Sequence, residues 1–241
     1  MIRILAESAL QLLFVLPIVL LTLKNRKLET VKILVAFTAF YLLNQVLLYL
    51  PFIYPDLKIS NWNTNWNWSG KTYAIIGALL FLAVYRKFPV SDYFLNFKQD
   101  RQFLKQGISL VIIILIIQSI VAFFSPSKSV NFETLFFQFT MPGINEEIAY
   151  RGIMLGLLVK ILKSKNLILN PALWITSILF GMAHGFYLTK DFNIIFDFQP
   201  FTVTMIYGLL WGWITLKSRS ILLALISHNL VNGMMNLIQM R

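Results

Sequence analysis

Two adjacent glutamates are placed to do chemistry inside an apolar part of this chain. Glu146 and Glu147 occur in the stretch Asn-Glu-Glu-Ile-Ala-Tyr-Arg, whereas the other eight of the ten acidic residues lie at the ends of apolar segments or between them. A carboxylate in the middle of a bilayer costs several kcal/mol, so it normally faces the protein interior and serves a function. The glutamate pair is therefore the first candidate for a catalytic site.

The two carboxylates are expected to have different roles, because neighbouring residues of an α-helix point about 100° apart. Glu147 lies four residues before Arg151, which is the favourable order for an ion pair on one helix face. Glu146 is then free on another face, and a carboxylate without a cation in a dry pocket suits a general base. The alternative is that all three residues only hold helices together.

Both histidines of the chain also fall in apolar segments. His184 follows Phe180 by four residues, and His228 precedes Asn232 by four residues, which places the last two side chains on one helix face. Asn232 and His228 could donate hydrogen bonds to a developing oxyanion, and His228 could instead hold a metal. A single histidine in a membrane helix more often joins two helices, but two of them, with none elsewhere, favour a site.

The composition indicates that most of the chain lies in a lipid bilayer. Of the 241 residues, 58% are hydrophobic and only 13% are charged, whereas soluble domains carry about 25% charged residues. The absence of cysteine excludes thiol nucleophiles, disulfides and thiolate metal sites. The net charge of +11 comes from basic residues at the ends of apolar segments, so it indicates a membrane surface and not nucleic acid.

We predict an all-α polytopic membrane protein with about eight transmembrane helices and a buried polar site. The candidate helices lie near residues 4–23, 32–54, 71–86, 107–125, 133–162, 171–189, 200–216 and 220–239. Pro142 and Gly143 are expected to break or restart the long fifth helix. The whole chain, 1–241, is predicted to be one membrane-embedded domain, with N-terminal spans in 1–130 and the spans that carry the chemical motifs in 131–241.

The distribution of basic residues predicts the orientation of these helices. Fourteen Lys and Arg residues fall in the odd-numbered connections, and six fall on the other side. Because cytoplasmic loops are enriched in Lys and Arg, the odd-numbered connections are predicted to be cytoplasmic and both termini to lie outside. The protein is thus expected to be a multi-pass integral membrane protein, in the inner membrane if its source is bacterial.

Two further patterns are interpreted as structural. Trp62, Trp66 and Trp68 alternate with asparagines and are expected to anchor the second connection in the lipid headgroups; a platform for substrate is the alternative. Glycine pairs four residues apart occur in three of the predicted helices, and such pairs let helices approach closely. These pairs are Gly152/Gly156, Gly181/Gly185 and Gly208/Gly212.

Three motifs together resemble a known family. Glu-Glu-x-x-x-Arg, Phe-x-x-x-His and His-x-x-x-Asn, each on a separate late helix, are similar to those of the CAAX-protease and bacteriocin-processing intramembrane proteases. That family includes the Ras-converting prenyl-protein endopeptidases and bacterial self-immunity proteins. The resemblance covers roughly residues 135–238, and the earlier helices support it only by being hydrophobic.

The resemblance implies a role for each matched residue in peptide hydrolysis. Glu146, assisted by His184, would activate a water molecule. His228 and Asn232 would bind the oxyanion of the tetrahedral intermediate, and Glu147 and Arg151 would orient the site. The family has been described both as metal-dependent and as glutamate-dependent, and a carboxylate with two histidines is a possible Zn²⁺ ligand set. The metal therefore stays open at this point.

The predicted activity is intramembrane endopeptidase cleavage near the end of a hydrophobic or lipidated peptide or protein. A non-enzymatic membrane protein is the alternative, either a bacteriocin immunity factor or a proton-coupled transporter, because acid–histidine chains also relay protons. Transporters commonly contain inverted repeats with paired broken helices. Here only the Pro142-Gly143 break is visible, without a matching half, which favours the enzyme. The expected partners are the substrate and membrane lipids.

Overall fold

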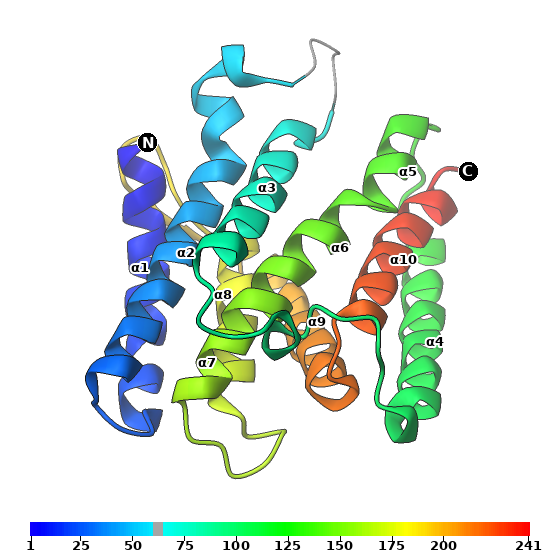
Figure 1. Ribbon diagram of the computed structural model, residues 1–241. Helices are drawn as coiled ribbons and strands as arrows, with labels where there is room; N and C mark the ends of the chain where they lie inside the picture. The colour runs from blue at the N-terminus through cyan, green and yellow to red at the C-terminus, as the bar shows by residue number, and fades with distance from the viewer. Residues whose placement is uncertain (60–64) are drawn as a thin grey trace.

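The computed structural model describes residues 1–59 and 65–241, and this part of the chain is mostly helical (Figure 1). Its α-helices are α1 (Ile2–Thr22), α2 (Leu28–Ile53), α3 (Trp68–Val84), α4 (Arg101–Phe124), α5 (Phe132–Gln138), α6 (Met141–Glu146), α7 (Leu155–Ile161), α8 (Pro171–Gly185), α9 (Phe198–Ser218) and α10 (Leu222–Gln239). A π-helical segment, η3 (Glu147–Met154), joins α6 to α7, and two 3₁₀ turns are η1 (Pro55–Leu57) and η2 (Val90–Tyr93). The predicted all-α class is confirmed, apart from one short hairpin.

The number of membrane-crossing helices is confirmed only in part. Among the described residues, α1, α2 and α4 are long and apolar enough to cross a bilayer by themselves, while α3 is apolar but has 17 residues. A crossing requires about 20 residues, and α8 has only 15. The prediction of about eight transmembrane helices is therefore supported for three of them.

The sixth predicted helix, 171–189, extends too far. In the structure α8 ends at Gly185, and Phe186–Leu188 (β1) pairs antiparallel with Ile194–Phe196 (β2). The helix stops where Asp197 donates its backbone N–H to the Gly185 carbonyl, at 2.7 Å. Hydropathy alone could not show this, because an apolar strand and an apolar helix end have the same composition.

The predicted break in the long fifth helix is confirmed. The helix that starts at Asn131, whose side chain accepts from Thr134 N, ends at Gln138. It restarts as α6 with Pro142 in its first turn, where the missing N–H of proline has no cost. The chain then widens into the π-helical segment that begins at Glu147, a form found frequently at functional sites.

Close packing of α8 against α9 explains two of the glycine pairs. A Cβ added to Gly185 would lie 2.5 Å from the Asp197 carbonyl oxygen, and one added to Gly208 would lie 3.0 Å from Ser177 Cα. These approaches place α9 directly against α8 and so bring their polar side chains to one interior. The predicted packing role of these glycines is confirmed.

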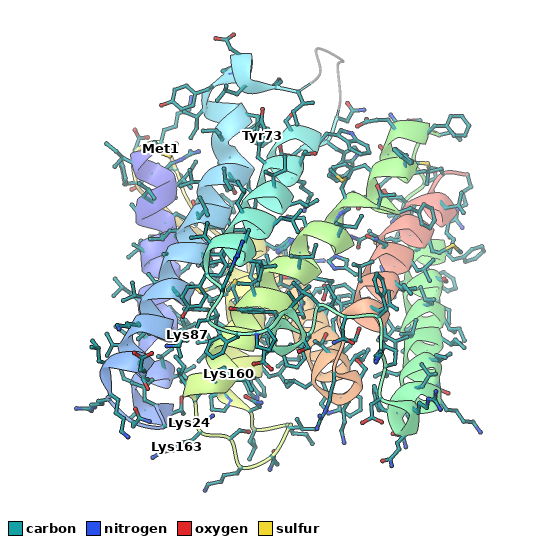
Figure 2. All side chains as sticks on the ribbon, viewed as in Figure 1. Met1, Lys24, Tyr73, Lys87, Lys160 and Lys163 are labelled. Carbon is teal, nitrogen blue, oxygen red and sulfur yellow. The ribbon has the colours of Figure 1, made fainter. Side chains whose placement is uncertain are left out.

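Two of the odd-numbered connections lie at the same end of the helix bundle. Figure 2 shows Lys24 and Lys163 at one end and Met1 and Tyr73 at the other. The first and fifth connections are joined directly, because Lys24 N donates to Ile161 O at 2.8 Å and Lys163 N donates to Thr22 O at 2.7 Å. The basic first and fifth connections therefore share one end of the molecule.

Trp66 and Trp68 pack against α5. Trp66 stacks on Phe137 of α5, with ring centroids 5.2 Å apart, and Trp68 donates from its indole to Glu133 at 2.8 Å. Both rings are thus partly covered by α5, and their anchoring in the lipid headgroups stays a prediction. Trp62 lies outside the described residues.

Candidate active site

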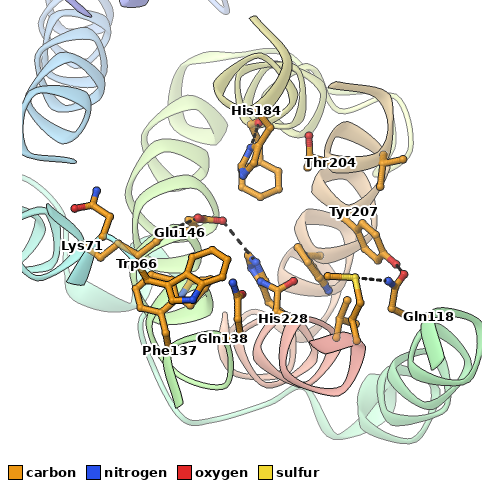
Figure 3. Close-up of a pocket in the computed structure, with 18 residues that line it drawn as sticks. Trp66, Lys71, Gln118, Phe137, Gln138, Glu146, His184, Thr204, Tyr207 and His228 are labelled. Carbon is orange, nitrogen blue, oxygen red and sulfur yellow. Dashed lines mark hydrogen bonds and ion pairs between the residues drawn. The ribbon is translucent and has the colours of Figure 1, made fainter. Parts of the chain in front are cut away.

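A cavity of about 490 Å³ lies between α3, α5, α6, α8, α9 and α10. Figure 3 shows Glu146, His184 and His228 in its wall. Asn232 also lines it, so the wall includes all four residues predicted to be catalytic. They come from α6, α8 and α10, which are far apart in the sequence. The structure therefore brings together every residue that the three motifs assign to catalysis.

Glu146 ends α6 and lies between a lysine and a histidine. Its Oε1 is 2.5 Å from Nζ of Lys71 in α3, and its Oε2 is 3.6 Å from Nε2 of His228. The Glu146 side chain is only 13% exposed. The expectation that Glu146 has no cationic partner is therefore wrong, because the first turn of α3 supplies one.

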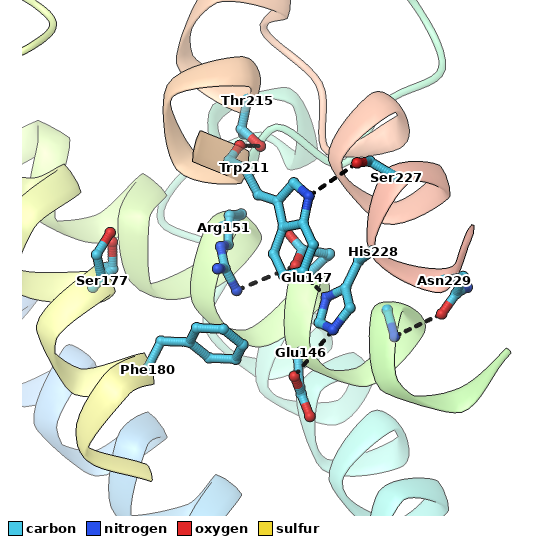
Figure 4. Close-up of polar contacts among 12 residues, drawn as sticks. Glu146, Glu147, Arg151, Ser177, Phe180, Trp211, Thr215, Ser227, His228 and Asn229 are labelled. Atoms are coloured by element: carbon cyan, nitrogen blue, oxygen red, sulfur yellow. Dashed lines mark hydrogen bonds and ion pairs between the residues drawn. The ribbon is translucent and has the colours of Figure 1, made fainter. Parts of the chain in front are cut away.

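His228 is held in place by the other glutamate of the pair (Figure 4). Its Nδ1 is hydrogen-bonded to Glu147 Oε1 at 2.8 Å, and Nη1 of Arg151 lies 3.2 Å from the same oxygen. The predicted Glu147–Arg151 ion pair is therefore present, and both side chains are almost completely buried. Arg151 and His228 share the charge of Glu147, which leaves Nε2 of His228 directed toward the cavity and Glu146.

Two aromatic rings pack against the His228–Glu147–Arg151 triad. Trp211 of α9 stacks on the His228 imidazole, with centroids 4.0 Å apart and an interplanar angle of 14°, and donates from its indole to Ser227 at 3.0 Å. The Arg151 guanidinium lies over the Phe180 ring at 4.2 Å. Cation–π contact of this kind is favourable in a desolvated interior, so the two rings fix the imidazole and the guanidinium in one orientation.

His184 enters the cavity from α8. Its Nδ1 is 2.8 Å from the Phe180 carbonyl oxygen. A carbonyl only accepts, so this contact assigns a proton to Nδ1 and leaves Nε2 as an acceptor toward the cavity. A neutral imidazole in this tautomer can accept a hydrogen bond from water.

Asn232 and Asn229 of α10 have different functions in the structure. Asn232 lies one turn after His228 and lines the same cavity, as their spacing predicts. Asn229 accepts the backbone N–H of Gly143 at 2.8 Å and so joins α10 to the first turn of α6. This contact keeps Glu146 and His228 in a common register.

We expect replacement of Arg151 by methionine to destabilise the fold. The substitution leaves the buried Glu147 carboxylate without its cation, and the loss of one partner of a buried ion pair typically costs about 3–5 kcal/mol. Thermal unfolding of the detergent-solubilised protein measures this loss. The double variant Arg151→Met/Glu147→Gln has no uncompensated charge and should recover part of the stability, whereas equal unfolding temperatures for wild type and Arg151→Met would contradict the assignment.

The side chains as arranged do not fit a zinc ion. Among the residues that the structure describes, no group of three His, Asp or Glu side chains lies close enough to hold a metal. Glu146 Oε1 is directed at the Lys71 ammonium, and His228 Nδ1 is directed at Glu147. Zinc stays a prediction from the residue types.

Sequence reasoning missed two residues of the site, Lys71 and Trp211. Lys71 is one of the six basic residues counted on the outer side, at the start of the predicted helix 71–86, and that position is compatible with a side chain that reaches inward. Trp211 lies between Gly208 and Gly212, whose spacing showed that this helix face packs closely. Neither signal indicates which partner the side chain meets.

Comparison with known proteins gives one match. Residues 128–234 match the family model described as type II CAAX prenyl endopeptidase Rce1-like. Neither the curated proteins nor the solved structures contain a match to the chain. The matched range contains Glu146, Glu147, His184, His228 and Asn232. Through this region the chain is similar to the Rce1-like type II CAAX prenyl endopeptidases.

Proposed function

We propose that the protein is a multi-pass intramembrane endopeptidase that hydrolyses a peptide bond near the end of a hydrophobic or lipidated substrate. The observation that carries this proposal is the shared cavity, which Glu146, His184, His228 and Asn232 line together. The family match supports the same conclusion because it covers these residues. By the positive-inside rule, the end that carries Lys24 and Lys163 faces the cytoplasm.

In the proposed reaction Glu146 is the general base. Its carboxylate takes a proton from a water molecule that also donates a hydrogen bond to Nε2 of His184, and the water oxygen attacks the carbonyl carbon of the scissile bond. When the tetrahedral intermediate collapses, the C–N bond breaks and Glu146 returns the proton to the leaving amine. The products are a new carboxylate and a new amine, with one water consumed.

His228 and Asn232 are proposed to stabilise the oxyanion. The Asn232 amide N–H donates directly, and His228 donates from Nε2. Because His228 donates its Nδ1–H to Glu147, donation from Nε2 as well requires the imidazolium form, with a proton on each ring nitrogen. Such hydrogen bonds are strong in a cavity from which bulk water is excluded.

The decisive test of the proposed function is the detection of cleaved peptide. The purified protein in nanodiscs is incubated with a hydrophobic peptide library, and mass spectrometry identifies matched pairs of fragments that add up to one substrate plus water. Such pairs support an endopeptidase. A complete absence of fragments across prenylated and unmodified peptides would overturn the proposal.

We expect this cleavage to persist after metal removal. Water activation by Glu146 needs no metal, and no three His, Asp or Glu side chains in the described part of the chain lie close enough together to hold one. Dialysis against a strong chelator should leave the rate of fragment formation unchanged. A loss of activity that added Zn²⁺ restores would contradict the metal-free mechanism and establish zinc as a cofactor.

A further inference from the structure

Lys71 is the least expected member of the cavity wall. It lies in the first turn of α3, in the N-terminal part of the chain and outside the range that matches the family. Its side chain is only 12% exposed, and its ammonium is 2.5 Å from Glu146 Oε1. Among the cavity-lining residues in 1–59 and 65–241, it is the only lysine or arginine.

The ion pair makes the Glu146 carboxylate a weaker base. Glu146 Oε1 accepts from Lys71, and Oε2 faces Nε2 of His228 at 3.6 Å. A nearby cation stabilises the ionised form of a carboxylate and so lowers its tendency to take up a proton. Glu146 therefore takes a proton from water more readily once the ion pair has opened.

An anion is required to draw the ammonium away, because an unpaired buried ammonium is costly. Apart from Glu146, the cavity wall in the described part of the chain contains no acidic side chain that could pair with Lys71. It has aromatic and neutral polar side chains instead, among them Trp66, Phe137 and Gln138 (Figure 3). A peptide that enters the cavity can bring its own carboxylate, either at its C-terminus or on an acidic side chain. Ammonium and carboxylate groups form strong, charge-assisted hydrogen bonds.

We propose that Lys71 binds a carboxylate of the substrate and thereby releases Glu146 to activate water. In the resting protein the Lys71–Glu146 pair neutralises both groups. When a substrate carboxylate binds, Lys71 changes partner, and Glu146 becomes a stronger base in the occupied cavity. This inference rests on the proposed endopeptidase function. It identifies a carboxylate as the group of the substrate that the site selects.

Kinetics with three matched peptides test the selection. One hydrophobic peptide is prepared with a free C-terminal carboxylate, with a C-terminal amide, and with an amide plus a glutamate near the C-terminus. Hydrogen bonds to charged groups contribute about 1.5–3 kcal/mol, so the wild type should cleave the free acid with a kcat/KM at least about tenfold above that of the plain amide. The glutamate peptide shows whether a side-chain carboxylate substitutes for the terminal one.

Variants of Lys71 locate the origin of this preference. Lys71→Met removes the charge with little change in length and should abolish the preference for the acid, while Lys71→Arg should retain it. Lys58→Met is the matched control, since Lys58 is exposed in the connection before α3, and it should keep the wild-type preference. A Lys71→Met enzyme that still prefers the acid as strongly as wild type would overturn the proposal.

Binding gives a second readout that does not depend on turnover. In Glu146→Gln the competing carboxylate is removed, so Lys71 should bind the free-acid peptide more tightly than the wild type does. The double variant Glu146→Gln/Lys71→Met, which has no uncompensated charge, should bind acid and amide equally. Equal affinity of the Glu146→Gln variant for the two peptides would overturn the proposal.

The two proposals fail in different ways. If the wild type cleaves the acid and the amide peptides equally well, the role of Lys71 is wrong but the endopeptidase function stands. If it cleaves none of the three peptides, while Glu146→Gln still prefers the acid in binding, the carboxylate site stands and the endopeptidase function is wrong.

Discussion

Glu146→Gln is expected to lower the rate of peptide cleavage by about 10²–10⁴-fold, because general-base catalysis contributes a factor of that size. The amide keeps the shape of the side chain but cannot take a proton from water. The loss should appear in kcat, measured by mass spectrometry of fragments formed by the purified protein in nanodiscs. The unfolding temperature is recorded in parallel to exclude loss of the fold.

Glu7→Gln is the matched control for this variant. Glu7 lies in α1, outside the cavity wall, and it accepts the backbone N–H of Leu188 at 2.8 Å. A glutamine oxygen can accept the same hydrogen bond, so Glu7→Gln should cleave at the wild-type rate. Full turnover by Glu146→Gln would show that another group activates the water.

Asn232→Ala is expected to lower kcat by about 10²–10³-fold, the usual effect of removing one oxyanion donor. The donor acts on charge that develops only in the transition state, so KM should change little. Steady-state cleavage of one peptide, measured over a range of concentrations, separates the two constants.

The same substitution one turn further along α10 provides the comparison. Asn236 donates to the Asn232 carbonyl at 2.9 Å but is not part of the cavity wall. Asn236→Ala should retain most of the wild-type kcat. A rise in KM without a fall in kcat for Asn232→Ala would assign Asn232 to substrate binding instead of oxyanion stabilisation.

The relations between Glu147, Arg151, His228 and Asn232 were largely predictable from spacing. Residues four apart in a helix share a face, and this regularity places Arg151 near Glu147 and Asn232 in the same cavity as His228. What spacing could not predict is the contact between His228 and Glu147. That contact depends on how α10 packs against η3, and the two residues are 81 positions apart in the chain.

The partner of Glu146 could not be predicted for a similar reason. Lys71 and Glu146 are 75 residues apart, and nothing in the sequence relates the start of α3 to the end of α6. A lysine at a helix end normally extends toward the membrane surface, so the charge count treated it as a surface residue. Its inward direction follows only from tertiary packing.

The extent of the helices was predicted well where apolar composition and helix breakers agree, as at Pro142. It was wrong at Phe186–Leu188, where three apolar residues continue the composition of α8 but form a strand. The helix ends there because the Asp197 backbone approaches Gly185. A contact between two segments that a hairpin separates cannot be predicted from the local amino-acid composition.

The most direct test of the account is a structure of the Glu146→Gln variant with an uncleaved peptide bound. The account predicts that the scissile carbonyl oxygen lies within hydrogen-bond distance of His228 Nε2 and the Asn232 amide. The substituted side chain at position 146 and the His184 imidazole should both face the carbonyl carbon. A peptide whose scissile bond lies elsewhere, or an Asn232 and a His184 that point away from it, would contradict the account.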